Sequence, residues 1–226
     1  MKKGFIIAID GPSGAGKSSS SRQLASQLGY RYIDTGALYR IVGLLAWEQH
    51  IRAEETDRLA TLCQKIPLHF VSDGADTKVL LDSRDITSAI RQPVVSQMAS
   101  KVSAQPIVRQ CLLTLQRDLG REGGVVMEGR DIGTVVFPDA DIKFYLDASL
   151  EERGRRRHQE LYQQGVATTI ETTIREMTER DQRDSARDHA PLRRAVDAIL
   201  IDTTSLSLAE VVRVMLENIC SKRKCS

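Results

Sequence analysis

A glycine-rich segment follows the first apolar run of this chain and ends in a lysine and two serines. Residues 5–10 are apolar up to Asp10, which predicts a β-strand. Residues 19–28 carry Leu24, Ala25 and Leu28 on one side, which predicts a helix. The segment between them reads Gly11-Pro12-Ser13-Gly14-Ala15-Gly16-Lys17-Ser18-Ser19. A strand, a Gly-x-x-x-x-Gly-Lys-Ser loop and a helix in this order predict a P-loop.

A loop of this kind binds polyphosphates through its backbone. Its glycines let N–H groups turn inward, and the helix N-terminus adds positive potential. Lys17 supplies a mobile positive charge, and the Ser18 hydroxyl is a ligand for Mg²⁺. We therefore expect residues 11–19 to bind ATP, with Mg²⁺ held through Ser18. The alternative is a Gly/Ser turn without a ligand, which has no need of Gly-Lys-Ser at its end.

Three further charges cluster where another apolar run ends. Residues 125–128 read Val-Val-Met-Glu, as a buried parallel strand does, and Arg130 and Asp131 follow closely. Open α/β sheets bind ligands beyond the carboxyl ends of their strands. We interpret Glu128, Arg130 and Asp131 as part of a ligand site, with an ion-paired loop as the alternative.

An excess of arginine marks residues 153–157. Two surface ion pairs at helical spacing are expected here, Glu151 with Arg155 and Glu152 with Arg156. No acidic residue stands four positions before Arg153 or Arg157. We therefore expect at least part of this arginine cluster to be free to bind phosphate.

The arginine-rich segment belongs to a predicted pair of helices around Gly165. Ser149-x-x-Glu152 and Thr168-x-x-Glu171 have the form of capping boxes, and each predicts the start of one helix. The second helix continues into the charged residues 181–188. Two charged helices about a short turn with a glycine are typical of a mobile lid.

Composition limits the classes of protein to consider. The chain has 226 residues and a net charge of only +2, so no global basic field indicates nucleic acid as a partner. The four cysteines have no metal-like spacing, and we expect reduced thiols. The apolar runs are too short to span a membrane. We expect a cytoplasmic protein without a membrane partner, and a monomer, because no apolar stripe is left unclaimed.

The remaining pattern predicts an α/β fold with one insertion. Strands are expected at 5–10, 30–34, 125–128, 141–147 and 198–202, and further helices at 37–49, 54–65, 93–102, 106–119 and 208–219. Residues 68–87 change to strand periodicity, with strands at 68–72, 77–82 and 84–87 and a turn at 73–76. A small antiparallel sheet inserted into a βα pattern indicates a subdomain on the substrate side.

The arginines discriminate among the reactions that a P-loop serves. The chain lacks an Asn-Lys-x-Asp guanine motif, which counts against a GTPase. A kinase for a phosphorylated acceptor needs positive charge on both sides of the transferred phosphoryl group and a lid that excludes water. Candidates on the insert side are Arg40, Arg109 and Arg130, and candidates on the lid side are Arg153 to Arg157, Arg180, Arg183 and Arg187. From its own segment, Arg40 is equally a surface residue of an amphipathic helix.

At this point the chain resembles the bacterial cytidylate (CMP/dCMP) kinase family. The motifs that carry the resemblance are Gly-Pro-Ser-Gly-Ala-Gly-Lys-Ser at 11–18, Asp-Thr-Gly-Ala-Leu-Tyr-Arg at 34–40, Gly-Arg-Asp-Ile-Gly-Thr-Val-Val-Phe-Pro at 129–138, and the Arg180 to Leu192 spacing. The resemblance covers essentially the full length. The family often has Ser where this chain has Thr35 and Gly-Thr where it has Ser18-Ser19, and both changes keep a hydroxyl.

The resemblance implies a P-loop NTPase three-layer α/β fold. A central parallel sheet would carry helices on both faces, with an inserted nucleoside-monophosphate-binding subdomain that has a small antiparallel sheet, and a helical lid. The chain would be one kinase domain over residues 1–226. Its expected parts are a core at about 1–40, 107–150 and 190–226, an insert at about 41–106 and a lid at about 151–189.

The resemblance also implies roles for single residues. It places Thr35, Arg40 and Arg130 on the acceptor phosphate, and Arg180 and Asp184 on the sugar. It places Ser100, Arg109, Asp131 and Arg187 on cytosine, where arginines donate to O2 and N3 and a carboxylate and a hydroxyl accept from the 4-amino group. The catalytic set would be Lys17, Arg40, Arg130, Arg153 and Arg157.

The expected reaction is direct in-line transfer of the ATP γ-phosphoryl group to CMP or dCMP, with Mg²⁺. A P-loop kinase for another acceptor, such as UMP, AMP or a metabolite, is the nearest alternative. An ATP-dependent nucleic-acid-binding or switch module that uses the helix at 153–157 on a phosphate backbone is the alternative from another class.

Overall fold

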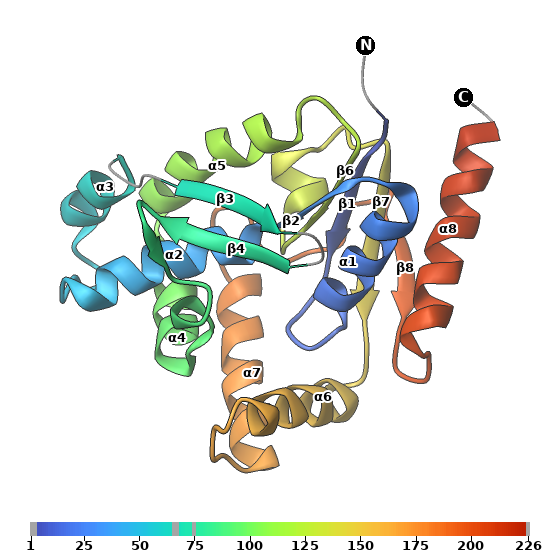
Figure 1. Ribbon diagram of the computed structural model, residues 1–226. Coiled ribbons are helices and arrows are strands. Elements are labelled where there is room, and N and C mark those ends of the chain that lie inside the picture. The colour runs from blue at the N-terminus through green and yellow to red at the C-terminus, as the bar shows by residue number, and fades with distance from the viewer. Residues whose placement is uncertain (1–3, 65–67, 74–75, 225–226) are drawn as a thin grey trace. The chain divides into compact units, whose positions relative to one another are not determined.

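The computed structural model describes residues 4–64, 68–73 and 76–224, and for residues 68–73, 76–78 and 224 the backbone only (Figure 1). The chain divides into two compact units. Unit 1 comprises Met1–Asp34 and Arg117–Ser226, and unit 2 comprises Thr35–Gln116.

Unit 1 is built on a five-stranded parallel sheet with the order β2-β6-β1-β7-β8. Its strands are β1 (Ile6–Asp10), β2 (Arg31–Asp34), β6 (Val125–Glu128), β7 (Ile142–Asp147) and β8 (Ile199–Asp202). Every residue of β1 and β6 is buried, as in a parallel sheet covered on both faces. The register pairs Asp34 with Glu128, so two carboxylates of neighbouring strands meet at the C-terminal edge of the sheet.

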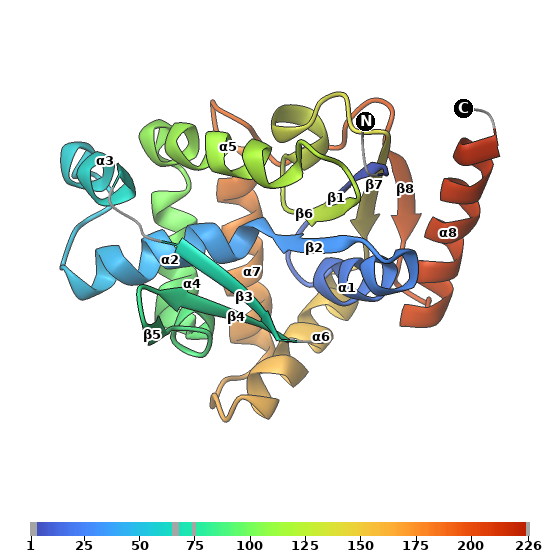
Figure 2. The same cartoon turned by 45° about the horizontal axis from the view of Figure 1, so that its top comes forward.

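Helices flank this sheet and complete the core of unit 1. They are α1 (Lys17–Leu28), α6 (Leu150–Gln163), α7 (Ile170–Ser185) and α8 (Leu208–Lys224), with a helical turn η2 (Ile132–Val136) after β6. Helices α1 and α8 pack against each other. Figures 1 and 2 show α6 and α7 as a pair beyond the C-terminal ends of the strands. The helices of this pair contact each other directly.

The helix boundaries follow from capping residues. Gly29 ends α1 in the left-handed conformation (φ 64°), and the Ser149 hydroxyl accepts from the Glu152 N–H at the start of α6. The prediction for α7 is wrong by one residue, because Thr169 and not Thr168 caps it, accepting from the Thr172 N–H. Helix α1 begins two residues earlier than predicted, directly after Gly16 (φ 84°).

Unit 2 contains helices around a small antiparallel sheet of order β3-β4-β5. Its elements are α2 (Thr35–Glu48), α3 (Thr56–Gln64), β3 (Leu68–Asp73), β4 (Asp76–Leu81), β5 (Arg84–Asp85), the turn η1 (Ala89–Arg91), α4 (Pro93–Val102) and the start of α5 (Pro106–Gly120). The predicted turn at 73–76 is too long, since Asp73 pairs with Asp76. The two residues between them lie outside the described residues.

The core of unit 2 depends on the close contact of α2 with α4. Both helices carry buried apolar residues, among them Leu38, Val42 and Val95. At Gly43 a Cβ atom would lie 2.8 Å from the Ala99 nitrogen and 3.1 Å from the Val95 carbonyl oxygen. The two helices therefore approach to a distance at which only glycine fits.

The fold predicted from the sequence is confirmed. A central parallel sheet flanked by helices, a small antiparallel sheet and a helical pair after β7 are all present. Among the described residues, no helix combines the length and the apolar character that crossing a membrane requires.

The contact at Gly43 generates a stability prediction. Gly43→Ala forces the backbone of α4 away from α2, and the cost should be about 1–3 kcal/mol in the free energy of unfolding. Urea unfolding followed by circular dichroism measures it. Thr114→Ala, on the exposed side of α5, is the matched control and should change stability by less than about 0.5 kcal/mol. Equal stability of the two variants would contradict the account.

Candidate active site

The loop after β1 is shaped by the close approach of its backbone to neighbouring elements. At Gly11 (φ 147°) a Cβ atom would lie 2.0 Å from the Leu146 carbonyl oxygen of β7. At Gly14 (φ 76°) it would lie 2.8 Å from the Arg153 carbonyl oxygen of α6. Larger residues at these two positions would displace backbone atoms, so the sequence of the loop is fixed by space as well as by conformation.

Lys17 is buried under this loop. Its Nζ donates to the Pro12 carbonyl oxygen at 2.6 Å. Burial, and after it the nearby charge of Arg130, lowers the pKa of Lys17 to about 7. Negative charge placed in the loop would favour the protonated form of Lys17, which is the form that binds phosphate.

A hydrogen-bonded set of oxygen atoms lies beside the first turn of α1. The buried Glu128 accepts hydrogen bonds from the hydroxyls of Tyr32 and Ser18. Burial, and after it the carboxylate of Asp34, raises the pKa of Glu128. A hydroxyl and two carboxylates at one sheet edge form a donor set of hard oxygen ligands.

Asp10, the last residue of β1, anchors the turn that follows β6. Its two carboxylate oxygens accept from the N–H groups of Ile132 and Gly133 at 2.8 and 2.7 Å. Burial raises the pKa of Asp10 to about 6 despite these two hydrogen bonds. Asp10 thereby ties the start of the glycine-rich loop to the segment that carries Arg130 and Asp131.

The helical pair contacts the glycine-rich loop through one ion pair. Arg153 of α6 donates to Asp181 of α7 at 2.5 Å and to the Ser13 carbonyl oxygen at 2.9 Å. Asp181 in turn accepts from the Ser13 N–H at 3.1 Å. Both backbone groups of Ser13 are thus held by the two helices.

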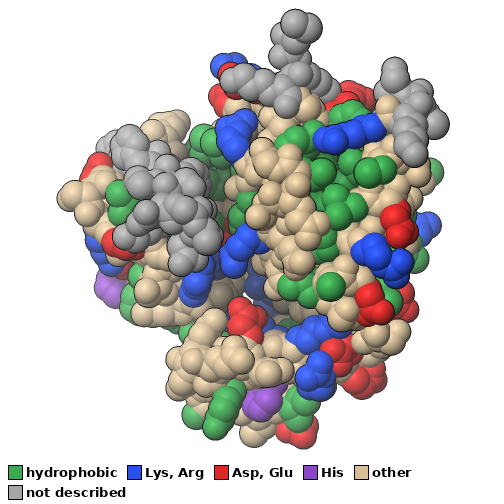
Figure 3. Space-filling view, turned by 45° about the vertical axis from the view of Figure 1, so that its right-hand side comes forward, with side chains coloured by type: hydrophobic (Ala, Val, Ile, Leu, Met, Phe, Trp, Pro, Cys, Tyr) green, Lys and Arg blue, Asp and Glu red, His purple; other side chains and the backbone are tan. Residues whose placement is uncertain are grey.

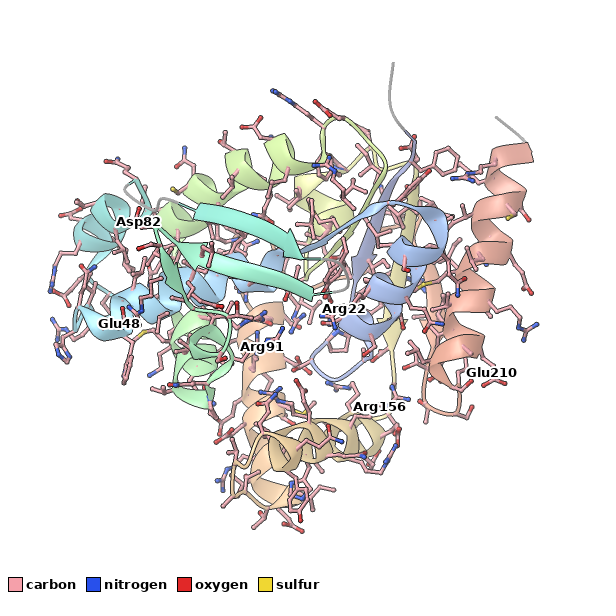
Figure 4. The ribbon with its side chains drawn as sticks, viewed as in Figure 1. Arg22, Glu48, Asp82, Arg91, Arg156 and Glu210 are labelled. Carbon is pink, nitrogen blue, oxygen red and sulfur yellow. The ribbon has the colours of Figure 1, made fainter. Side chains whose placement is uncertain are left out.

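A second arginine of α6 holds the other end of the loop. Arg156 donates to the hydroxyl and the carbonyl oxygen of Thr203 at 2.9 and 2.6 Å, and the Thr203 hydroxyl donates to the Ala15 carbonyl oxygen at 3.2 Å. Figure 4 shows Arg156 on α6 beside the end of β8. Thr203 follows β8 directly, so this contact joins three segments of unit 1.

The expectation that part of the arginine cluster at 153–157 has no acidic partner is wrong. Arg153 pairs with Asp181 from the neighbouring helix, and Arg157 pairs with Glu160 at 2.8 Å. Arg155 pairs with Glu152 rather than with Glu151. Partners three residues ahead in a helix, or on another helix, are not captured by counting four residues back.

Arg130 and Arg187 share one buried carboxylate. Asp184 of α7 accepts from Arg130 Nε at 3.0 Å and also pairs with Arg187. Although burial opposes it, the charges of Arg130, Arg187 and Arg180 hold the pKa of Asp184 below its usual range. Three predicted site residues therefore form one cluster, and Arg180 contributes to its field.

In unit 2, another group of predicted residues gathers around α5. The guanidinium of the buried Arg109 lies 5.4 Å from the centre of the Tyr39 ring and donates to the Ser103 carbonyl oxygen at 3.3 Å. The Ser103 hydroxyl donates to the carbonyl oxygen of Ser100, which is buried on α4. Thr35 is buried at the start of α2, and Arg40 lies one turn further along that helix.

The sequence analysis did not single out several residues that hold the site in unit 1. Asp10, Tyr32, Asp181 and Thr203 each contact the loop or a neighbouring charged residue. Asp10 and Asp34 are the last residues of their strands, and a carboxylate at the end of a predicted parallel strand could have identified them as site residues. Tyr32 and Thr203 are brought in by tertiary packing, and no local pattern marks them.

The fold and this loop define a class. A parallel sheet whose first strand leads through Gly-x-x-x-x-Gly-Lys-Ser into a helix is the nucleotide-binding architecture of P-loop proteins. A solved structure of the same fold is shikimate kinase from Acinetobacter baumannii in complex with shikimate, with a TM-score of 0.52, 16% identity, and coverage of 97% of this chain and 95% of that chain. At this identity the likeness concerns the fold alone.

Sequence comparison narrows the class to one family. The profile of the cytidylate kinase family matches residues 7–221. A cytidylate kinase from Geobacter sulfurreducens is 51% identical over 223 residues, which are 99% of this chain and 95% of that protein. A cytidylate kinase from Syntrophotalea carbinolica is 50% identical over 224 residues, with the same two coverages. The chain belongs to the cytidylate kinase family.

The buried carboxylate of Asp184 generates a prediction on stability and pH. Asp184→Asn leaves Arg130 and Arg187 without the shared charge, which should cost about 3 kcal/mol at neutral pH. Because the pKa of Asp184 is lowered by folding, its contribution is present above the unfolded pKa of about 3.9 and is lost as pH falls further. Urea unfolding at several pH values measures the difference between variant and native protein.

The matched control is Asp188→Asn, which changes an exposed carboxylate near the end of the same segment. Its effect should stay below about 0.5 kcal/mol at every pH. A cost for Asp184→Asn that is the same at low and neutral pH would show that the charge of Asp184 is not what stabilises the cluster.

Proposed function

We propose that this protein transfers the γ-phosphoryl group of ATP to CMP or dCMP, giving ADP and CDP or dCDP. The observation that carries the proposal is the identity of 50–51% with cytidylate kinases over nearly the whole chain. The geometry of the glycine-rich loop supports it from the chemical side, since the loop suits a polyphosphate donor. No covalent enzyme intermediate is needed, and the acceptor phosphate, which is already ionised, requires no strong general base.

The donor side is assigned to residues 11–19 and the helical pair. The N–H groups of the loop and the first turn of α1 would bind the β- and γ-phosphates, with Lys17 between them. Arg153 contacts Ser13 of the loop, which places a guanidinium beside the donor segment. Arg157 would require release from Glu160 before it could act on phosphate.

The residues beside α1 fit a magnesium ion. Ser18 is exposed at the start of the helix, and the carboxylates of Glu128 and Asp34 lie behind it. Within the described part of the chain, no three His, Cys, Asp or Glu side chains form a metal cage. This agrees with Mg²⁺, which takes few protein ligands and completes its shell with water and substrate phosphates. Bound there, Mg²⁺ would neutralise charge that develops on the phosphate oxygens.

The acceptor side is assigned from the family motifs. Thr35, Arg40 and Arg130 would hold the acceptor phosphate, because two guanidinium groups bind such a group in bidentate fashion. Arg109, Ser100, Asp131 and Arg187 would read cytosine, and Arg180 and Asp184 would bind the sugar. For Arg109, its burial and its contact with Tyr39 support a fixed orientation of the side chain.

The chemical step depends on positioning of the two substrates and on stabilisation of negative charge more than on acid–base catalysis. Arg40 and Arg130 would hold the acceptor oxygen at attack distance, and Lys17 with the loop amides would stabilise the departing phosphate. The ion pair of Arg153 with Asp181 couples the helices of unit 1 to Ser13. Movement of α6 and α7 would therefore also move Ser13 of the loop, as the closure of a lid over ATP requires. The expected parts, a core with an insert at about 41–106 and a lid at about 151–189, remain part of this proposal.

Two alternatives differ in measurable ways. A kinase for UMP, AMP or a metabolite would use the same loop with another acceptor pocket. A nucleic-acid-binding module would use a continuous basic surface, whereas acidic and basic side chains are interspersed over the right-hand part of Figure 3. The net charge of +2 supports the same conclusion.

An acceptor panel tests the proposal. In a coupled assay for ADP with CMP, dCMP, UMP and AMP, kcat/KM for the two cytidine nucleotides should exceed that for the others by about 10²-fold or more. Asp131→Asn should lower the preference for CMP over UMP by about tenfold, because it removes the carboxylate proposed to accept from the 4-amino group. Asp139→Asn, at an exposed site eleven residues after the end of β6, should leave the preference unchanged. A native preference for UMP or AMP would overturn the assignment.

A further inference from the structure

Two cysteines that are far apart in the sequence meet inside unit 2. Cys63 lies near the end of α3, and Cys111 lies in the first half of α5. Cys63 is buried in an apolar cluster with Leu59, Val108 and Leu112, and the partly buried Cys111 packs against the same cluster. The two thiols are hydrogen-bonded to each other. Nothing in the proposed phosphoryl transfer uses either of them.

The two sulfur atoms differ in their surroundings. Cys63 is only 7% exposed, whereas Cys111 is partly open to solvent. Burial, together with the hydrogen bond to Cys111, raises the pKa of Cys63 to about 12. Cys63 therefore stays protonated and donates its hydrogen bond to the sulfur of Cys111. An oxidant from solvent reaches Cys111 first, and Cys63 lies next to the oxidised Cys111.

We propose that Cys63 and Cys111 form a dithiol site that a peroxide closes to an intramolecular disulfide. In the first step Cys111 loses its proton and its thiolate attacks one oxygen of the peroxide. The O–O bond breaks, Cys111 becomes a sulfenic acid, and the second oxygen takes up the released proton and leaves as water. In the second step the sulfur of Cys63 attacks that of Cys111, and the departing hydroxyl takes the Cys63 proton and leaves as water. The two thiols are oxidised by two electrons, and the peroxide is reduced to two waters.

The geometry fits this chemistry because the resolving thiol is already in contact with the reacting one. The sulfur atoms must approach to about 2.05 Å in a disulfide, so closing the bond requires movement from the hydrogen-bonded arrangement. The bond would join α3 to α5 within unit 2. Cys220 is exposed on α8 in unit 1.

Mass spectrometry of the full chain tests the site. The reduced protein, treated with a small excess of hydrogen peroxide, should lose about 2 Da. Peptide mapping should then link the peptide of Cys63 to that of Cys111, and dithiothreitol should restore both thiols. Phenylarsine oxide, which bridges neighbouring sulfur atoms, should bind one equivalent per chain before oxidation and none after it.

Single variants separate the two thiols. Cys63→Ser should trap the sulfenic acid on Cys111, where dimedone labels it, and Cys111→Ser should leave Cys63 unreacted. Cys220→Ser is the matched control and should form the disulfide as the native chain does. The measurements on native protein stand even where a core variant folds poorly. A native chain that keeps both thiols, stops at the sulfenic acid or links Cys220 instead would overturn the proposal.

Discussion

The close approach of Gly11 to the Leu146 carbonyl oxygen fixes where the glycine-rich loop leaves the sheet. A Cβ atom at this position would lie only 2.0 Å from that oxygen, so only glycine lets the loop take this path beside the paired strands β1 and β7. The following residues then turn into α1, so that Lys17 and Ser18 stand at the C-terminal edge of the strands. Asp10, Glu128 and Asp34 end three strands of the same sheet, which is why the charged groups of unit 1 collect at this edge.

Carboxylates hold most of the arginines at this edge. Asp181 holds Arg153, Glu152 holds Arg155 and Arg156, and Asp184 holds Arg130 and Arg187. A guanidinium that is already partly desolvated and oriented loses less freedom when phosphate binds than one that is free in solvent. A carboxylate, like a phosphate group, offers negatively charged oxygen atoms that accept hydrogen bonds from a guanidinium. This arrangement keeps several arginines near the loop although the net charge of the whole chain is only +2.

Periodicity and capping residues were enough to predict nearly all of the elements. The strand before Gly11, the cap at Ser149 and the helix start at Pro93 depend on local sequence, and the structure confirms them. The ion pairs of Arg153 and Arg157 were predicted wrongly, because their partners depend on how α6 packs on α7 and on which helical neighbour is preferred. Tyr32 and Thr203 could not be found from sequence, since their hydroxyls reach Glu128 and Ala15 only after the sheet has formed. The roles of the acceptor residues remain predictions that rest on the family motifs.

Transfer of labelled phosphate tests the central claim most directly. With ATP labelled at the γ-phosphate and CMP as acceptor, the label should appear in CDP and not in inorganic phosphate, because a kinase must keep water from the transferred phosphoryl group. Lys17→Ala should slow the appearance of labelled CDP by about 10²-fold or more, while circular dichroism shows a folded protein. Label found mainly in inorganic phosphate, or transfer at a nearly native rate by Lys17→Ala, would contradict the account.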